Sequence, residues 1–408
     1  MRFLILIISL SISCAAFSQN INDGLICYYP FDGYPIVDKS GNGNKAFIGA
    51  DSTLGCGVEG NAMRFDGLRT DMFIVGPASF DNFKTGPFSV SFYFKASNQV
   101  GNSTLDIISK RKNCTTDSSF AIRYTPSTNQ LSVEVSENVK IRNVIIQRLD
   151  FGRCWQHIVV VRDYNKLLLY VNGRLAQTNL ATRRVNITSD APLAIAKSPC
   201  LQTTDRKFAG YLDELRIYDR PITEDEVSLL YAAPDRIANK DTIIFLGSRV
   251  KINVTRTCAT DFTWSPKEDL TSFRTDTTTI TPKAGGIFKY ILTMKEAQCV
   301  SLDTIQIKVI DPATLDCGKI FLPKAFTPNG DALNNEFFIS NPFAIGELEV
   351  FEIFDSWGSK MFTTTDKFER WNGQFLGKDL NPGVYVWKAR FKCRGETLSD
   401  FGSVTLLK

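Results

Sequence analysis

The sequence contains one histidine among its 408 residues. A metal site built from several histidines is therefore excluded, and so is a reaction that needs two imidazole groups. The excess of one charge over the other is small too: 47 basic residues stand against 43 acidic ones, and the net charge of +4 is spread thinly along the chain. No region carries the concentrated positive charge that binding to a phosphate backbone requires, so nucleic acid is not a predicted partner.

Long apolar runs are scarce as well, apart from one at the start of the chain. Arg2 precedes an apolar run over residues 3–12, and Ala16 and Ser18 place small side chains at the −3 and −1 positions ahead of Gln19. This pattern is typical of a secretory signal peptide, which we expect at residues 1–18. No later run approaches the ~20 apolar residues of a membrane-spanning helix, so no transmembrane segment is predicted in the mature chain.

The predicted leader decides the chemistry of the ten cysteines. Its removal before Gln19 leaves nine cysteines in an oxidising compartment, where disulfides form. Several disulfides are therefore expected, with at least one cysteine free or paired with another molecule. A lipoprotein signal around Cys14 is the alternative, although Ser11 stands where such a signal usually has Leu.

Short runs of β-branched and aromatic residues fill the rest of the chain, separated by Gly, Asn, Pro and Asp. This pattern predicts an all-β protein. The sequence Val-Asn-Gly at residues 171–173 predicts a tight hairpin turn. One helix is expected at residues 223–231, where Thr223 and Glu226 can form a capping box.

Two breaks divide the chain after the leader. The sequence Ala-Ala-Pro at residues 232–234 follows the expected helix, and the Asp-Pro pair at residues 311–312 separates two further blocks. Such breakers mark domain boundaries and linkers. We therefore expect three folded domains, at residues 19–233, 236–312 and 317–408.

Six separated strings in the first domain share their order and spacing with a known family. They are residues 24–33, 38–44, 62–67, 155–162, 169–173 and 210–221. This domain resembles the laminin G-like modules of bacterial surface proteins, which have a concanavalin A-like jelly roll. The resemblance implies two stacked antiparallel sheets that bind a glycan or a protein ligand on a loop face or a concave face.

The resemblance also implies a Ca²⁺ ion that ties the N-terminal loop to the last strand. Its candidate ligands are Asp38, Asn42 and Asn44 in a Gly-rich loop, and Asp213 ahead of the final strand. Carboxylate and amide oxygens are the ligands that Ca²⁺ prefers. The alternative is a turn-rich loop without an ion and a solvated Asp213.

Other side chains of this domain are candidates for contact with a ligand. The rings of Tyr28, Tyr124 or Tyr164 can stack on a sugar, although an aromatic ring in a β-rich chain more often lies in the core. The basic clusters at residues 110–112 and 183–184 can attract an anionic polysaccharide. We favour the interpretation that both clusters are solvated loop charges.

The residues of a glycosidase are missing. Some concanavalin A-like jelly rolls are glycosidases that place two Glu and one Asp on one strand, and no such string is present. His157 lies in a strand-like run and is interpreted as structural, and no second His exists to activate a nucleophile. We therefore predict a binding protein without catalytic residues. A polysaccharide-active enzyme and a structural surface or matrix protein remain the alternatives.

Alternating apolar and polar residues in the second domain predict a small β-sandwich. The alternating runs are residues 250–254, 288–292 and 305–309. Cys258, Trp264 and Cys299 are similar to those of the immunoglobulin-like modules that precede sorting domains in Bacteroidota surface proteins. This resemblance implies a Cys258–Cys299 disulfide and the role of a spacer.

The third domain contains the most specific strings: residues 320–331, 350–362, 371–378, 382–387 and 402–408. It resembles the gliding-motility-associated C-terminal domain, the type B sorting signal of type IX secretion. The resemblance implies another β-sandwich, recognition by the type IX secretion machinery, and delivery outside the cell or to its surface. Its matched sorting-motif residues are Phe326, Thr327, Pro328, Asn329, Gly330, Asp331, Trp357 and Gly358.

The remaining cysteines are assigned less directly. Cys317 can pair with Cys393, which would tie the start of the third domain to a late strand. The matching loops of similar laminin G-like modules suggest a pair between Cys114 and Cys200. Cys154, inside a strand-like run, is the candidate for the unpaired thiol.

Overall fold

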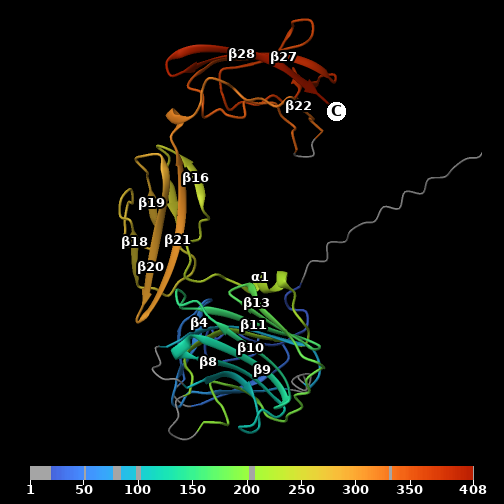
Figure 1. Ribbon diagram of the computed structural model, residues 1–408, viewed down its shortest axis with the longest axis vertical. Coiled ribbons are helices and arrows are strands. Elements are labelled where there is room, and N and C mark those ends of the chain that lie inside the picture. Colours follow the sequence, from blue (N-terminus) through green and yellow to red (C-terminus); the bar gives the residue numbers. More distant parts are fainter. Residues whose placement is uncertain are drawn as a thin grey trace, which may run out of the picture. The chain divides into compact units, whose positions relative to one another are not determined.

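The computed structural model describes residues 20–49, 52–76, 84–97, 103–201, 207–329 and 333–407 (Figure 1). The predicted leader, Cys14 included, lies outside the described residues. Strands dominate the chain, which confirms the all-β prediction, and the predicted capping box of Thr223 and Glu226 opens helix α1 (Glu224–Leu230). Among the described residues, no helix is long and apolar enough to cross a membrane.

The chain groups into two compact units. One comprises the chain up to Lys240 together with Lys251–Thr278 and Tyr290–Ile305. The other comprises Asp241–Val250, Thr279–Lys289 and the chain from Gln306 onward. The predicted second domain therefore contributes residues to both units.

Two sheets form the first domain. The eight-stranded sheet has the order β13–β12–β11–β6–β15–β4–β3, with β1 beside β15, and the seven-stranded sheet has the order β10–β9–β8–β7–β14–β5–β2. The strands of the eight-stranded sheet are β1 (Leu25–Tyr29), β3 (Thr53–Cys56), β4 (Asn61–Asp66), β6 (Phe88–Ala96), β11 (Gln156–Asp163), β12 (Lys166–Val171), β13 (Arg174–Leu180) and β15 (Ala209–Tyr218). Those of the seven-stranded sheet are β2 (Lys45–Ile48), β5 (Met72–Val75), β7 (Leu105–Lys110), β8 (Ser119–Thr125), β9 (Gln130–Asn138), β10 (Ile141–Arg148) and β14 (Leu193–Ile195).

The core of this domain lies between the two sheets. Because side chains alternate along a strand, β8 directs Phe120, Ile122 and Tyr124 into the core and directs Arg123 and Thr125 to the other face. The predicted Val-Asn-Gly turn connects β12 and β13, where Asn172 and Gly173 have positive φ angles of 51° and 76°. Each sheet thus has one inner face, buried in the core, and one outer face.

Apolar residues cover part of the outer face of the eight-stranded sheet. Val159 and Val161 of β11 pack there against Val227 and Leu230 of α1. Tyr93 of β6 donates a hydrogen bond to the carbonyl of Leu230 and accepts one from the amide of Ala232, at 2.8 and 2.7 Å. The helix and the segment after it therefore close this part of the outer face.

The middle part of the chain also consists of strands. A four-stranded sheet has the order β16–β21–β20–β18, and β17 pairs with β19. Trp264 is fully buried there, and its indole N–H donates to the carbonyl of Thr275 at 2.8 Å. The strands are β16 (Thr242–Phe245), β17 (Val250–Ile252), β18 (Asp261–Ser265), β19 (Thr278–Ile280), β20 (Gly286–Glu296) and β21 (Cys299–Ile310).

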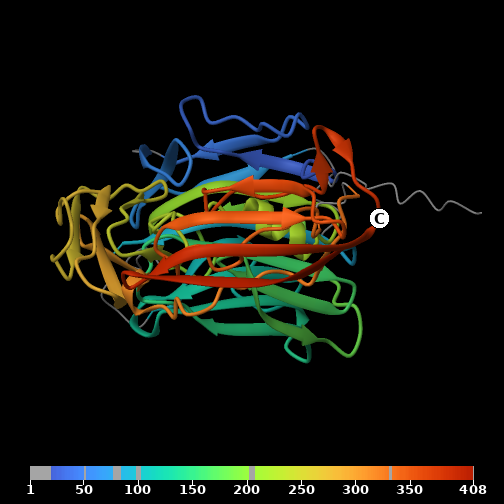
Figure 2. The ribbon, with the colours of Figure 1, turned by 90° about the horizontal axis from the view of Figure 1, so that it is seen from above.

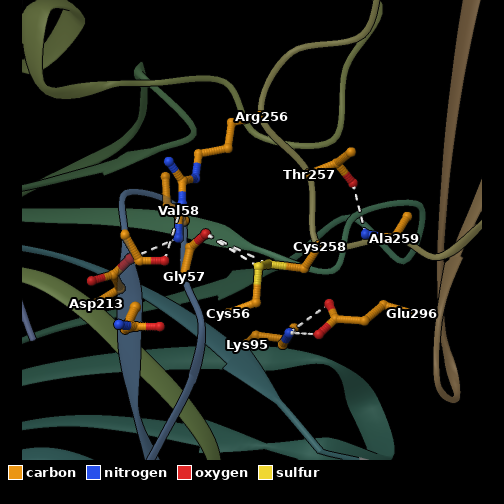
Figure 3. Close-up of a disulfide and its surroundings, with 12 residues drawn as sticks. Cys56, Gly57, Val58, Lys95, Asp213, Arg256, Thr257, Cys258, Ala259 and Glu296 are labelled. Carbon is orange, nitrogen blue, oxygen red and sulfur yellow. Dashed lines mark hydrogen bonds and ion pairs between the residues drawn. A yellow bond between two sulfur atoms is a disulfide. The ribbon is translucent and has the colours of Figure 1, made fainter. Parts of the chain in front are cut away.

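The predicted Cys258–Cys299 disulfide is wrong. Cys258 pairs with Cys56 at the end of β3 (Figure 3), and Cys299 pairs with Cys154, just ahead of β11. An immunoglobulin-type bridge needs two cysteines buried between facing sheets, whereas Cys258 and Cys299 are both partly exposed and turn toward the first domain. Two covalent bonds therefore join the middle part of the chain to the jelly roll.

Polar contacts accompany these two disulfides. The Lys95 ammonium group lies 2.6 Å from Glu296 Oε2 (Figure 3) and 4.9 Å from the ring centroid of Trp155. The amide of Cys154 donates to Ser301 Oγ, and the amide of Leu302 donates to the carbonyl of Gly152. Covalent and polar contacts therefore hold this segment against the jelly roll.

The unpaired cysteine is also corrected. Cys27, not Cys154, is the free thiol among the described residues. Its side chain points from β1 into the core, and burial raises the pKa of the Cys27 thiol well above its ordinary value. No other cysteine belongs to that core cluster, so Cys27 has no cysteine to pair with.

The C-terminal part of the chain contains a five-stranded sheet in the order β22–β28–β27–β23–β24, with a small β25–β26 pair. The antiparallel strands β27 and β28 appear in red in Figure 2. The structure pairs Cys317 with Cys393 and Cys114 with Cys200, the partners that the sequence suggests. The strands are β22 (Ala325–Phe326), β23 (Leu348–Phe354), β24 (Lys360–Thr364), β25 (Gln374–Phe375), β26 (Lys378–Asp379), β27 (Gly383–Cys393) and β28 (Glu396–Leu406).

Candidate functional site

The outer face of the seven-stranded sheet presents a row of side chains that crosses every strand. Residues directly opposite each other on neighbouring antiparallel strands share a face of the sheet. The pairings therefore define one continuous row: Phe47, Phe73, Ala194, Ser109, Ala121, Glu134 and Val144. A second row beside it contains Asp106, Arg123, Ser132 and Ile146.

A groove of about 660 Å³ lies over β8, β9 and β10 at this face. A smaller cavity of about 200 Å³ adjoins it, because Thr104 and Arg123 line both. The smaller cavity is bordered by Asp106, Arg111 and Cys200, so the Cys114–Cys200 disulfide forms part of its wall. The groove itself is lined by Thr104, Thr116, Arg123, Thr125, Gln130, Ser132, Glu134, Arg142, Val144, Ile146 and Asn179.

Charged groups in the groove are arranged by depth. The Glu134 side chain is only 5% exposed and forms ion pairs with Arg123 and with Arg142, the latter at 3.5 Å. The two arginine side chains are 24% and 48% exposed. In the smaller cavity, Arg111 Nη1 lies 4.0 Å from Asp106 Oδ2 and 3.2 Å from Cys200 Sγ. The carboxylates lie at the floor, and the more exposed groups of the main groove are guanidinium groups.

One of the two basic clusters is not what we expected. Lys110 and Arg111 are buried, and the Lys110 ammonium group donates to the carbonyl of Ala191 at 2.6 Å. The interpretation as solvated loop charges is therefore wrong for these two residues, because Lys110, paired with Phe120, lies on the inner side of β7 and Arg111 lines the smaller cavity beside Asp106. It fits Lys112 and Arg183, which are exposed and paired with Asp190 and Glu137.

The Ca²⁺ candidates fall into two separate hydrogen-bonded groups. Both carboxylate oxygens of Asp38 accept hydrogen bonds within the loop, from Tyr28, Ser40 and Asn44 among others. The amide of Asn42 donates to the carbonyls of Leu25 and Ile26. In a cation site these oxygens would face an ion, not N–H and O–H donors.

The carboxylate oxygens of Asp213 are likewise occupied by hydrogen-bond donors. It accepts hydrogen bonds from the amides of Val58, Glu59 and Glu214 (Figure 3 shows the first of these residues), while burial raises its pKa to about 8. No group of three or more His, Cys, Asp or Glu side chains that could hold a metal is found among the described residues. Calcium binding stays a prediction from the resemblance.

The aromatic candidates and the histidine have structural surroundings. Tyr124 belongs to the core, and Tyr28 lies under Arg216 and donates to Glu214. His157 is buried between two tyrosine rings, with centroid distances of 4.4 Å to Tyr93 and 5.8 Å to Tyr231. Burial lowers the pKa of His157 to about 3, so the ring is neutral and out of reach of a substrate.

Exposed Tyr164 is covered by a different cation. The guanidinium carbon of Arg184 lies 4.1 Å from its ring centroid. The tyrosine ring therefore already has a stacking partner from the second basic cluster.

The residues of the sorting motif differ in their surroundings. Phe326 is buried against Trp371, with ring centroids 5.3 Å apart, whereas Trp357 is 91% exposed at the turn that Gly358 completes with a φ of +85°. The amides of Thr327 and Asn329 donate hydrogen bonds within the loop, and Pro328 lines a cavity of about 680 Å³. Gly330 and Asp331 lie outside the described residues.

Sequence reasoning missed the charged residues of the groove. Arg123, Glu134 and Arg142 come from three different strands. The polar half of the alternation in residues 119–125 and 130–136 is the signal that could have pointed to this face. Which charges face one another depends on the register, which the sequence did not show.

The two stacked sheets form a jelly roll, and comparison with known families agrees. Residues 69–228 match the family model of the concanavalin A-like lectin/glucanases superfamily, of the laminin G-like type. Residues 320–406 match the type IX secretion signal domain model. The chain therefore carries a laminin G-like domain and a type IX secretion signal domain, each matched over its own part of the sequence. A search of curated proteins gives no match.

Solved structures with similar arrangements include toxin and enzyme domains. A botulinum neurotoxin serotype D/C binding domain is 13% identical, with a TM-score of 0.47 over 94% of this chain and 79% of that one. Domain 4 of a GH43 arabinanase from Geobacillus stearothermophilus, in complex with arabinotriose, is 20% identical, with a TM-score of 0.38 over 51% and 98%. With TM-scores below 0.5, neither bears on the ligand of this chain.

Proposed function

We propose that this chain is an exported or surface-displayed protein that binds a saccharide, without turning it over, in the groove over β8, β9 and β10. The observation that carries the proposal is the groove itself, which is open, polar and lined by hydroxyl, amide and charged side chains. Such groups exchange hydrogen bonds readily with the hydroxyl groups of a sugar. The outer face of the other sheet is covered in part by α1, which favours the seven-stranded side as the binding face.

The type IX domain supplies the route to the cell surface. We expect that removal of residues 317–408 leaves the protein in the periplasm of a host with a type IX secretion system. Cell fractionation measures this outcome, with the full chain as the control. Normal export of the truncated chain would contradict the sorting role.

A glycan array probed with the full mature chain tests the binding proposal. The array is run with Ca²⁺ and with a chelator, which also tests the calcium prediction. Ser132→Trp places a bulky ring in the groove, and we expect it to abolish the saccharide signals. Ser399→Trp on β28 is the matched control, because Ser399 is exposed in the C-terminal sheet and should leave binding unchanged.

The other outcomes separate the alternatives. Release of shortened saccharides would favour a polysaccharide-active enzyme. Silence of the array would favour a structural surface or matrix protein. Signals that survive Ser132→Trp would place the binding site elsewhere on the chain.

A further inference from the structure

In the groove the negative charge is buried and the positive charges are more exposed. This arrangement bears on which class of saccharide the groove can bind. Glu134 lies at the floor with one ion pair on each side, to Arg123 and to Arg142. Its carboxylate is almost completely shielded from solvent, whereas half of the Arg142 side chain is exposed. A ligand that enters the groove therefore meets guanidinium groups before it meets a carboxylate.

The arginines retain donors for a ligand. A guanidinium group has five N–H donors in a planar fork, and the ion pair between Arg142 and Glu134 uses Nη1 at 3.5 Å. Glu134 fixes the two arginines in place without occupying all of these donors. A carboxylate or sulfate group accepts two parallel N–H bonds from such a fork, which gives both strength and orientation.

The described lining of the groove lacks an aromatic ring on which a neutral sugar could stack. None of the residues that line the groove in the described part of the chain is aromatic. Stacking of a sugar ring on an aromatic face is therefore not available along the floor, whose apolar part consists of Val144 and Ile146. Thr125, Gln130 and Ser132 provide hydrogen bonds to hydroxyl groups but cannot distinguish a neutral sugar from a charged one.

We propose that the groove selects anionic saccharides, those with carboxylate or sulfate groups, through Arg123 and Arg142. This inference rests on the proposed function and narrows it to a ligand class. Arg142 contacts the acidic group of the ligand, Arg123 supports it from the neighbouring strand, and the surrounding hydroxyl and amide groups bind the sugar. Glu134 is a positioning residue.

The test compares three oligosaccharides of one backbone on the full mature chain: a uronate form, its carboxyl-reduced neutral form, and a sulfated form. We expect the uronate or the sulfated form to bind at least tenfold more tightly than the neutral one at 50 mM NaCl. The preference should shrink at 300 mM NaCl, because salt screens exposed charges. The comparison of uronate with sulfate identifies which acidic group is recognised.

Two substitutions locate the preference. Arg142→Gln should lower the ratio of anionic to neutral affinity at least fivefold, whereas the control Arg183→Gln, at an exposed pair with Glu137, should leave the ratio unchanged. Glu134→Gln should lower the ratio as well, although it removes a negative charge, because it releases the two arginines. A simple charge effect would raise the ratio and would contradict the positioning role.

The remaining results distinguish this inference from the proposed function. Equal binding of neutral and anionic forms, still blocked by Ser132→Trp, would overturn the ligand class and leave saccharide binding intact. Binding of neither form would overturn both. Equally tight binding of an acidic peptide would overturn the choice of a saccharide.

Discussion

The two outer faces of the jelly roll differ in exposure, although the same alternation of side chains forms both. One is partly covered by the chain itself, and the other carries an open groove. On the eight-stranded sheet, β11 presents Val159 and Val161 outward, and these residues are buried beneath α1. On the seven-stranded sheet, β8 presents Arg123 and Thr125, and the face remains a groove. The chemistry of the outward half of each strand therefore decides whether a face is closed by the chain or left for a ligand.

The covered face should respond to substitution as a core does. Tyr93→Ala removes a ring that packs on His157 and bonds Leu230 and Ala232. We expect a loss of about 3–5 kcal/mol in the free energy of unfolding, as for other buried aromatic residues. Urea unfolding of the full chain measures it. Ile146→Ala on the exposed groove floor is the control and should change stability by less than about 0.5 kcal/mol. Similar losses in the free energy of unfolding at both positions would contradict the difference between the covered face and the open face.

The disulfide between the jelly roll and the middle part should contribute the next largest effect. The double substitution Cys56→Ser with Cys258→Ser opens a loop that spans 202 residues of sequence. Loss of such a constraint typically costs about 2–4 kcal/mol. We expect a lower unfolding midpoint and faster proteolytic cleavage of residues 232–260, followed by mass spectrometry. An unchanged cleavage rate would show that the noncovalent contacts alone hold the two parts together.

The buried histidine makes the stability of the covered face depend on pH. Because the pKa of His157 is about 3 when folded and near 6.5 when unfolded, the unfolded chain takes up a proton first as the pH falls. Stability is therefore lost progressively below about pH 6.5, by roughly 2 kcal/mol between pH 7 and pH 5. His157→Gln should remove this part of the pH dependence in urea unfolding. If the free energy of unfolding changed with pH in the same way for both proteins, His157 would not be the source of this pH dependence.

Local patterns in the sequence were sufficient for the strands, one hairpin turn and the helix, whereas the jelly-roll arrangement was predicted from the family resemblance. Alternation predicted the strands, Val-Asn-Gly predicted the turn between β12 and β13, and the Thr223 capping box predicted α1. Each of these signals lies within a few residues, so no knowledge of distant contacts was needed. The Cys317–Cys393 pair also follows from the layout of a single domain.

Contacts between distant segments could not be predicted in this way. The pairing of Cys258 depends on which surface of the middle part meets β3, and no local pattern reports that. The candidate site could not be predicted for the same reason, since Arg123 and Glu134 meet only because β8 and β9 pair in one register. Arg111 was noticed as part of a basic cluster, but its burial at the end of β7 follows from the loops around it.

The Cys154–Cys299 bond has a mechanical consequence. A ligand held in the proposed groove would pull on β8, β9 and β10, and β10 leads along the backbone to Cys154. From there tension passes through the disulfide to Cys299 at the start of β21 and onward to the C-terminal domain. The residues between these two cysteines, which are 145 positions apart in sequence, would be spared from extension while the bond is intact. Strain on an attached ligand would thus bypass the chain between the two cysteines, the segment at residues 232–260 included.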